Sequence, residues 1–290
     1  MPASLTPPHS LLPVALLSAA LVLGACSSEP IGGGPPSPTT TPGGAPTPGI
    51  AGPNVVGPAG IAEWDALGSK ADVTTFRTLY LHQSVGQDLQ GGAARVGFKF
   101  EYYGPNQADL KAGLNGGLFG DVGPVDNGKP MEKMAVVRRV LARHRASLRV
   151  LSFKFGYADV RSEDLEAVET EYVKLVAEVK AAGVRFVHVT PPLVFDVSEN
   201  APKMRMRSFM LERFKDDTIF DLQDLESLDR GVRCERGGVW HICQANRSTA
   251  ACPSNDQGID GDGQGHLCST KATELAKAML LALHRAGVQK

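Results

Sequence analysis

The sequence predicts an α/β fold with a five-stranded, mainly parallel sheet and helices on both of its faces. Apolar, β-rich runs alternate with helical patterns along the chain, and such alternation favours parallel strands joined by right-handed crossovers. Several runs lack polar alternation, as expected for strands covered on both faces. Strands are expected at residues 78–81, 98–103, 149–155, 184–190 and 218–222.

Helices are expected between these strands. Apolar residues from Leu165 to Val179 recur at helical spacing, with Ser162 as a candidate N-cap and Gly183 at the expected C-terminal end. A second helix is expected after Pro130, a third over about residues 270–286, and a short one is expected to begin near Val85. The sequence contains no internal repeat, so one domain is expected over residues 55–290.

The first fifth of the chain has a different composition from this domain. Thirteen of the 20 prolines lie in the first 58 residues, and no Lys or Arg precedes Lys70. The formal net charge of −1 and the pI near 6.7, with no clustered basic arm, argue against a nucleic-acid binder. This balance leaves the charge of a substrate undetermined.

The N-terminus resembles a bacterial lipoprotein signal. Residues 11–23 form an apolar run of signal-peptide length that is followed by Gly24, Ala25 and Cys26, similar to a lipobox. Residues 1–25 would be removed and Cys26 would carry the lipid, although the segment before the apolar run has no Lys or Arg. An ordinary signal peptide with an incidental cysteine is the alternative. Residues 26–54 read as a disordered tether, so the domain is expected outside the cytoplasm, anchored to a bacterial membrane.

The remaining four cysteines lie in one stretch and are expected to form two disulfides in an oxidising compartment. Their spacing leaves all three pairings open, and a zinc site is the alternative. The surrounding segment, about residues 227–268, reads as an insertion that either holds the following loop in place or only stabilises the domain. The cysteines are Cys234, Cys243, Cys252 and Cys268.

A candidate nucleophile follows the first expected strand. The motif His82-Gln83-Ser84-Val85-Gly86 places a serine at a strand-to-helix turn, where backbone N–H groups can face a developing oxyanion. Taken alone, the motif favours Ser84 as a helix N-cap over Ser84 as a nucleophile. His82 is interpreted as a hydrogen-bonded residue of the sheet, with a substrate contact as the alternative.

The loop before the last helix could supply the other groups. His266 would act as a general base, and an aspartate close by would fix its tautomer and stabilise its charged form. Asp260 and Asp262 lie a few residues upstream. A calcium loop is the alternative, but Gly258 and Ser269 stand where an EF-hand would need acids.

In their order along the chain, these features resemble the SGNH/GDSL hydrolase superfamily, in a divergent branch with a His-x-Ser-x-Gly nucleophile motif. The resemblance covers about residues 76–286 and implies a three-layer, flavodoxin-like sandwich and a Ser-His-Asp esterase. Ser84 would attack the ester and His266 would act as base and then as acid. The family's Asp-x-x-His spacing points to Gly263, so Asp262 is taken as the orienting acid, with Asp260 as the alternative.

The resemblance also implies an oxyanion hole made of the Ser84 N–H, a glycine after the second strand and an asparagine after the third. Gly104 matches the glycine, with Gly123 as another option. After the third expected strand the sequence reads Gly156-Tyr157-Ala158-Asp159, so Ala158 stands where the amide donor is expected. Either Asn106 or Asn127 would have to supply that donor instead. Asp159 is interpreted as a structural hydrogen-bond acceptor, and Lys154 and Tyr157 as residues that line the pocket.

The function expected from these features is that of a cell-envelope lipoprotein esterase or deacylase, acting on a carbohydrate or small ester without a cofactor or metal. Ala158 and the stretched spacing between Asp262 and His266 motivate an alternative, a non-catalytic lipoprotein that binds glycan or a protein partner. A flavodoxin-like cofactor binder is the third option, although only Gly86 follows the first strand where a glycine-rich phosphate loop would be needed. The acyl group, the acceptor and the oligomeric state are not determined by the sequence.

Overall fold

The computed structural model describes residues 52, 54–254 and 264–289. The expected signal peptide, Cys26 and nearly all of the tether lie outside the described residues, as do Asp260 and Asp262. Within the described part of the chain, no helix is both long and apolar enough to cross a membrane.

A seven-stranded sheet forms the centre of the domain, in the order β1-β7-β6-β5-β2-β4-β3, and every neighbouring pair is parallel. The predicted parallel α/β sheet is therefore confirmed, but the predicted count of five strands was wrong. The strands are β1 Val55–Val56, β2 Thr78–His82, β3 Glu101–Tyr102, β4 Leu114–Leu118, β5 Val150–Phe153, β6 Arg185–Val189 and β7 Thr218–Phe220.

The second predicted strand needs a correction. Residues 98–103 supply only the two-residue edge strand β3, whereas the neighbour of β2 is β4, with the sequence LNGGL. Its two glycines give it low β propensity, which is why the strand was missed. A Cβ on Gly116 would lie 2.1 Å from Gln90 Oε1, so the glycine allows the helix above to approach the sheet closely.

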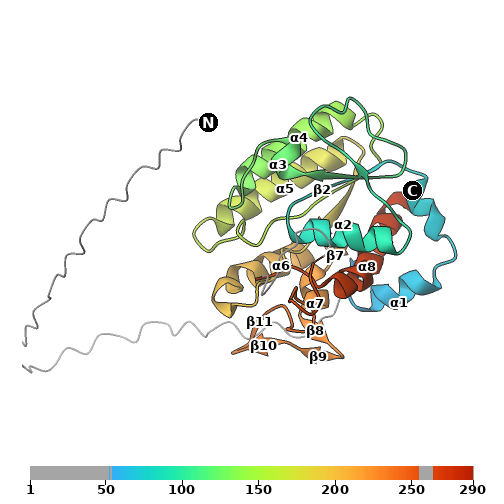
Figure 1. The fold of residues 1–290 in the computed structure, drawn as a ribbon. Helices are drawn as coiled ribbons and strands as arrows, with labels where there is room; N and C mark the ends of the chain where they lie inside the picture. Colours follow the sequence, from blue (N-terminus) through green and yellow to red (C-terminus); the bar gives the residue numbers. More distant parts are fainter. Residues whose placement is uncertain (1–51, 53, 255–263, 290) are drawn as a thin grey trace, which may run out of the picture. The chain divides into compact units, whose positions relative to one another are not determined.

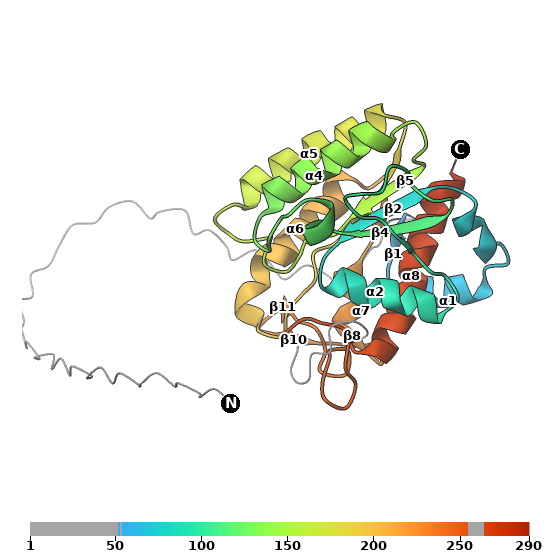
Figure 2. The same ribbon diagram turned by 45° about the horizontal axis from the view of Figure 1, so that its top comes forward.

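Helices cover both faces of the sheet (Figures 1 and 2). One core packs α4, α5 and α6 on the sheet, and the other packs α1, α2 and α8. The predicted helices are confirmed, except that α5 begins at Leu165 without a cap from Ser162. The helices are α1 Ala59–Ala66, α2 Val85–Arg95, α3 Phe119–Val122, α4 Pro130–His144, α5 Leu165–Ala181, α6 Ala201–Arg213, α7 Leu222–Glu226 and α8 Ser269–Val288.

Helices α2 and α8 pack closely through small residues. A Cβ on Gly92 of α2 would lie 2.2 Å from the backbone oxygen of Ala272 on α8, a distance that real Cβ contacts do not reach. Ala93 and Ala276, also fully buried, continue this small-residue packing. The close approach brings the first turn of α2 next to the residues that precede α8.

The cysteine-rich segment forms two short antiparallel hairpins, β8 Leu228–Asp229 with β9 Val232–Arg233, and β10 Glu235–Arg236 with β11 Val239–Trp240. The expectation of two disulfides is confirmed, and the pairing is sequential: Cys234 with Cys243, and Cys252 with Cys268. Because each sulfur is bonded to another sulfur, the alternative of a zinc site on these cysteines is excluded.

Candidate active site

Ser84 lies at the turn between β2 and α2, at the carboxyl edge of the sheet. Its backbone has φ 56° and ψ −120°, a conformation that side-chain-bearing residues rarely adopt and that costs about 1–3 kcal/mol. The hydroxyl makes no capping bond to α2, although Ser84 occupies the N-cap position. Instead Oγ lies 2.8 Å from His266 Nε2, so the geometry supports the nucleophile interpretation over the cap.

His266 is held between Ser84 and a carboxylate. Its Nδ1 lies 2.9 Å from Asp88 Oδ2, and this oxygen also accepts the backbone N–H of Leu267 at 3.1 Å. A carboxylate accepts hydrogen bonds, so Nδ1 carries the proton and Nε2 is left to accept the hydroxyl of Ser84. Asp88 is fully buried and His266 is 5% exposed. The three side chains form the connected series that a serine hydrolase requires.

The acid in this series differs from the one expected. We expected Asp262, or Asp260, to orient His266; both lie outside the described residues, and the structure gives the Nδ1 contact to Asp88. Sequence reasoning missed Asp88 because the family spacing directed attention to the loop before His266. A signal was present, since Asp88 lies one helical turn after Ser84, and an acid is favourable in the first turn of a helix.

The loop that carries His266 is fixed from two sides. Phe195 donates its backbone N–H to Gln264 O at 2.8 Å, and a Cβ on Gly265 would lie 2.7 Å from Leu193 O. On the other side, Ser248 of the cysteine-rich segment donates its backbone N–H to His266 O at 2.7 Å. These contacts support the expectation that the insertion holds the loop of His266 in place.

The Cys252–Cys268 disulfide should matter for catalysis more than the Cys234–Cys243 disulfide does. It ends two residues after His266 and closes the loop that carries this residue. Replacing both Cys252 and Cys268 with alanine should cost about 3 kcal/mol of stability, as expected for a loop of about 15 residues. It should also slow any hydrolysis of p-nitrophenyl acetate at Ser84 by allowing His266 to move. Urea unfolding and initial rates on p-nitrophenyl acetate measure the two effects.

The double replacement of Cys234 and Cys243 is the matched control, because that disulfide closes a loop of sequence separation 9 without a catalytic residue. It should reduce stability while leaving the hydrolysis rate of the folded protein nearly unchanged. Equal losses of rate in both double variants would contradict a specific role for Cys252–Cys268.

The expected oxyanion donors are only partly assembled around Ser84. None of the hydrogen bonds among the described residues uses the backbone N–H of Ser84, which leaves it available to an oxyanion. Gly104 and Asn106 follow the edge strand β3, which β4 separates from β2, and Asn106 is exposed. Asn127 lies beside the loop after β5, since its Oδ1 is 3.3 Å from the position of a Cβ on Gly156.

Asp159 has the structural role predicted for it. Its carboxylate is buried and accepts the backbone N–H groups of Gly128 at 2.8 Å and Gly156 at 2.5 Å. It also pairs with the buried ammonium of Lys133 at 2.6 Å. Asp159 thus ties the start of α4 to the loop after β5, the loop that carries Ala158.

His82 has the contacts of a sheet residue. Its Nε2 lies 2.7 Å from Gln90 Oε1, and its ring stacks on Tyr80 with the centroids 4.8 Å apart. Burial lowers the pKa of His82 to about 4, a shift that the Gln90 bond partly opposes. The ring is therefore neutral near pH 7 and donates to Gln90, which supports the interpretation as a hydrogen-bonded residue of the sheet.

The pocket-lining role expected of Lys154 is wrong, because its side chain is fully buried. Tyr157, by contrast, is partly exposed and lines a cavity of about 400 Å³ together with Ala158, Arg161, Ser198 and Lys203. This cavity lies beside the loop after β5. Because β5 and β2 are parallel neighbours, the loop after β5 leaves the sheet at its carboxyl edge, where Ser84 also lies.

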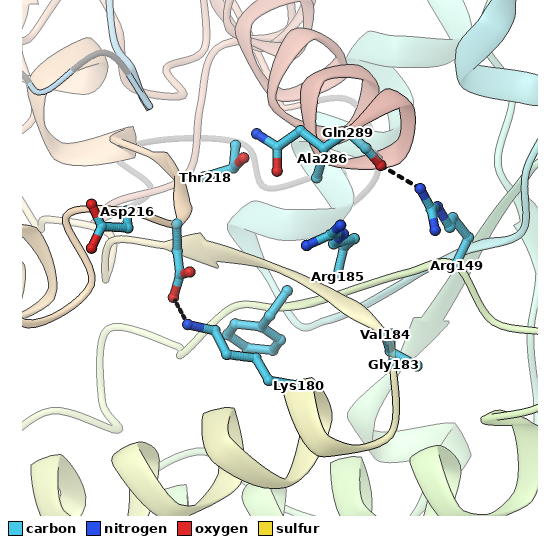
Figure 3. A pocket seen from close by; sticks show the side chains of 11 residues that line it. Arg149, Lys180, Gly183, Val184, Arg185, Asp216, Thr218, Ala286 and Gln289 are labelled. Carbon is cyan, nitrogen blue, oxygen red and sulfur yellow. Dashed lines mark hydrogen bonds and ion pairs between the residues drawn. The ribbon is translucent and has the colours of Figure 1, made fainter.

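A second cavity, of about 420 Å³, lies at the amino-terminal ends of the strands (Figure 3). Its lining includes Arg149 and Arg185, where β5 and β6 begin, and Lys180, which pairs with Asp217 at 2.6 Å. Arg149 donates to the backbone oxygen of Gln289. Because this cavity is at the amino ends of the strands, it is separate from the Ser84 site.

No protein-family model matches the chain, and no curated protein matches it. Among solved structures, the chain is similar to a protein from Streptococcus pneumonia described as "a putative platelet activating factor", with a TM-score of 0.41 and 11% identity. The match covers 77% of this chain and 91% of that one. The interpretation of the Ser84 site therefore rests on the geometry of its own residues.

Proposed function

We propose that the protein is a serine hydrolase of the esterase type, with an SGNH-like, three-layer sandwich as its scaffold. The observation that carries the proposal is the hydrogen-bonded series Ser84–His266–Asp88 at the carboxyl edge of a parallel sheet, the edge where ligands bind in open α/β folds. The positive φ of Ser84 adds to it, because backbone strain of this kind is concentrated at functional sites.

In the proposed reaction, Ser84 Oγ attacks the carbonyl carbon of an ester while His266 Nε2 takes its proton. Asp88 stabilises the imidazolium that results, and the backbone N–H of Ser84 donates to the oxyanion. The protonated His266 then gives its proton to the departing alcohol, leaving an acyl-enzyme. Water attacks that acyl group, with His266 again acting as base, and Ser84 is regenerated.

The cavity beside Tyr157 and Ala158 is the proposed place for the remainder of the substrate, because its volume of about 400 Å³ falls in the usual range of ligand sites. We propose an O-acyl group on a carbohydrate or another small ester as the substrate. We further propose that the chain is exported and anchored through a lipid on Cys26. The lipobox-like sequence supports this location, and so do the two disulfides.

Ala158 favours a second candidate function. It stands where the family places an amide donor, and the loss of one oxyanion donor typically costs about 2.7–4 kcal/mol of transition-state stabilisation. A protein that retained the cleft without efficient turnover would bind a glycan or a protein partner there. This alternative requires no change in the arrangement of Ser84 and His266.

Covalent labelling tests the proposal most directly. Purified protein is treated with a fluorophosphonate probe, and the modified residue is located by mass spectrometry, while p-nitrophenyl acetate hydrolysis is followed in parallel. In the unmodified protein the label should be found on Ser84. Hydrolysis should be lost in Ser84→Ala, and labelling should be slow in His266→Ala. An unlabelled Ser84 together with equal hydrolysis by all three proteins would favour the binding protein.

A further inference from the structure

Phe195, in the loop after β6, lies beside the loop of His266 and has two arginines stacked on its ring. The guanidinium carbon of Arg247 lies 4.2 Å from the ring centroid and that of Arg236 lies 4.7 Å from it, both within the range of cation–π contacts. The backbone N–H of Phe195 donates to Gln264 O at 2.8 Å. Gln264 precedes His266 by two residues, a span of at most about 7 Å, so the loop of Phe195 runs close to His266.

Arg247 connects the ring of Phe195 to the other side of the His266 loop. Its backbone forms an antiparallel β-bridge with Leu267, and the next residue, Ser248, donates its N–H to His266 O at 2.7 Å. The side chain of Arg247 is 5% exposed and donates to Gln244 Oε1 at 3.3 Å. Arg247 is therefore part of the packed wall beside His266.

Arg236, on β10, differs from the other stacked arginines in its exposure and its charge balance. Two further arginines stack on the ring of Trp240, and each of them pairs with an acid. The pairs are Arg207 with Asp221 and Arg233 with Asp224. Arg236 is exposed, and no carboxylate oxygen of the described residues lies within 4.0 Å of its guanidinium nitrogens. Its positive charge is thus presented to solvent at the edge of the His266 wall.

The acid that faces Arg236 is Asp196, and its carboxylate has another role. Its Oδ1 accepts the backbone N–H of Ser198 at 3.0 Å, and this bond, with a smaller contribution from the charge of Arg236, lowers the pKa of Asp196. The N–H groups around the guanidinium of Arg236 therefore remain accessible. A stacked guanidinium loses little further freedom on binding, and its planar N–H groups match the two oxygens of a carboxylate.

We propose that Arg236 determines specificity by binding a carboxylate of the substrate, so that the hydrolytic site acts on anionic esters. The inference rests on the proposed function and deepens it, because it names the charge of the substrate. An O-acylated sugar acid would satisfy both proposals. Binding of a carboxylate at Arg236 can be measured without turnover, so the two proposals can fail separately.

Two acetyl esters that differ in charge test the inference, 4-acetoxybenzoate and the neutral 4-acetoxybenzamide. The value of kcat/KM is measured for each ester in the full protein and in Arg236→Gln. The ratio of the two values is then compared, which cancels any effect of the substitution on the reacting groups. In Arg236→Gln the ratio of anionic to neutral ester should fall by about tenfold, the lower end of what a hydrogen bond to a charged group contributes. The change should lie in KM, because the carboxylate is bound equally in the ground state and the transition state.

Arg230→Gln is the matched control, because it removes one positive charge from the same cysteine-rich segment. The side chain of Arg230 is 90% exposed, and it stacks on no aromatic ring of the described residues. Its replacement should leave the ratio within about twofold, since salt screens charges that are not in contact. Arg236→Lys keeps the charge without the planar N–H groups and should give an intermediate ratio. An unchanged ratio in Arg236→Gln, or an equal fall in Arg230→Gln, would overturn the inference.

NMR covers the case in which the protein hydrolyses neither ester. With nitrogen-15 in the arginine side chains, the Nε–H signals of Arg236 and Arg230 are assigned from their absence in the two glutamine variants. Titration with 4-hydroxybenzoate should shift the Arg236 signal and leave the Arg230 signal in place, and 4-hydroxybenzamide at the same concentration should shift neither. If this pattern is found without hydrolysis, the esterase proposal fails and the carboxylate site stands. If 4-hydroxybenzoate shifts neither signal, or both equally, Arg236 is not a carboxylate site.

Discussion

Asparagine in place of Asp88 should lower kcat on p-nitrophenyl acetate by about 10⁴-fold, the loss typical for this position in serine hydrolases. The carboxylate of Asp88 accepts from His266 Nδ1 at 2.9 Å and from the backbone of Leu267 at 3.1 Å. An amide can present its NH₂ group to Nδ1, which would favour the tautomer with the proton on Nε2. His266 could then no longer accept the proton of Ser84. Because Asn keeps the size of Asp, the fold should be retained, which thermal unfolding would show.

The same experiment separates Asp88 from the acids first expected from the sequence. Asp262→Asn and Asp260→Asn should leave kcat within a few-fold of the wild-type value, since the Nδ1 contact belongs to Asp88. A loss of about 10⁴-fold in either loop variant, with Asp88→Asn near wild type, would show that the loop supplies the orienting acid during turnover.

The sequence predicted those parts of the fold that depend on local patterns. The buried runs that form β2, β5, β6 and β7 are rich in apolar and β-branched residues, and α4, α5 and α8 have clear helical periodicity. The strand β4 was missed because Gly116 faces Gln90 of α2 and Gly117 faces Val122, Leu81 and Tyr103, so both glycines meet a requirement set by packing between distant segments. Pairing of the cysteines was left open for a similar reason, since it depends on where the hairpins place each sulfur.

In the candidate site too, residues placed by local sequence features were predicted, whereas residues placed by contacts between distant segments were not. Ser84 and His266 were predicted because a strand-to-helix turn and a loop before the last helix are local features. Asp88 was missed because its role depends on the close contact of α2 with α8, where Gly92 meets Ala272. Lys154 was expected to line the pocket, but its side chain is fully buried. Its burial follows from the helices that cover this face of the sheet.

Loss of the Lys133 ammonium should destabilise the protein by about 3–5 kcal/mol, the usual effect of leaving a buried charge without its partner. In Lys133→Met, the carboxylate of Asp159 would lose an ion pair of 2.6 Å while both side-chain positions remain fully buried. Urea unfolding at pH 7 measures the change. Because Asp159 also holds Gly128 and Gly156, the loop that carries Ala158 should become less ordered, and kcat/KM should fall with the stability.

Lys154→Met is the matched control for Lys133→Met, since both lysines are fully buried but only Lys133 has a carboxylate at ion-pair distance. It should cost much less stability, because it removes a desolvated amine and leaves no close carboxylate unpaired. Adding Asp159→Asn to Lys133→Met should recover part of the loss, since the amide is neutral and its oxygen can still accept one of the two backbone N–H groups. Equal destabilisation by the two lysine variants, with no recovery in the double variant, would mean that packing of the lysine stems, and not the charge of Asp159, decides the stability of this loop.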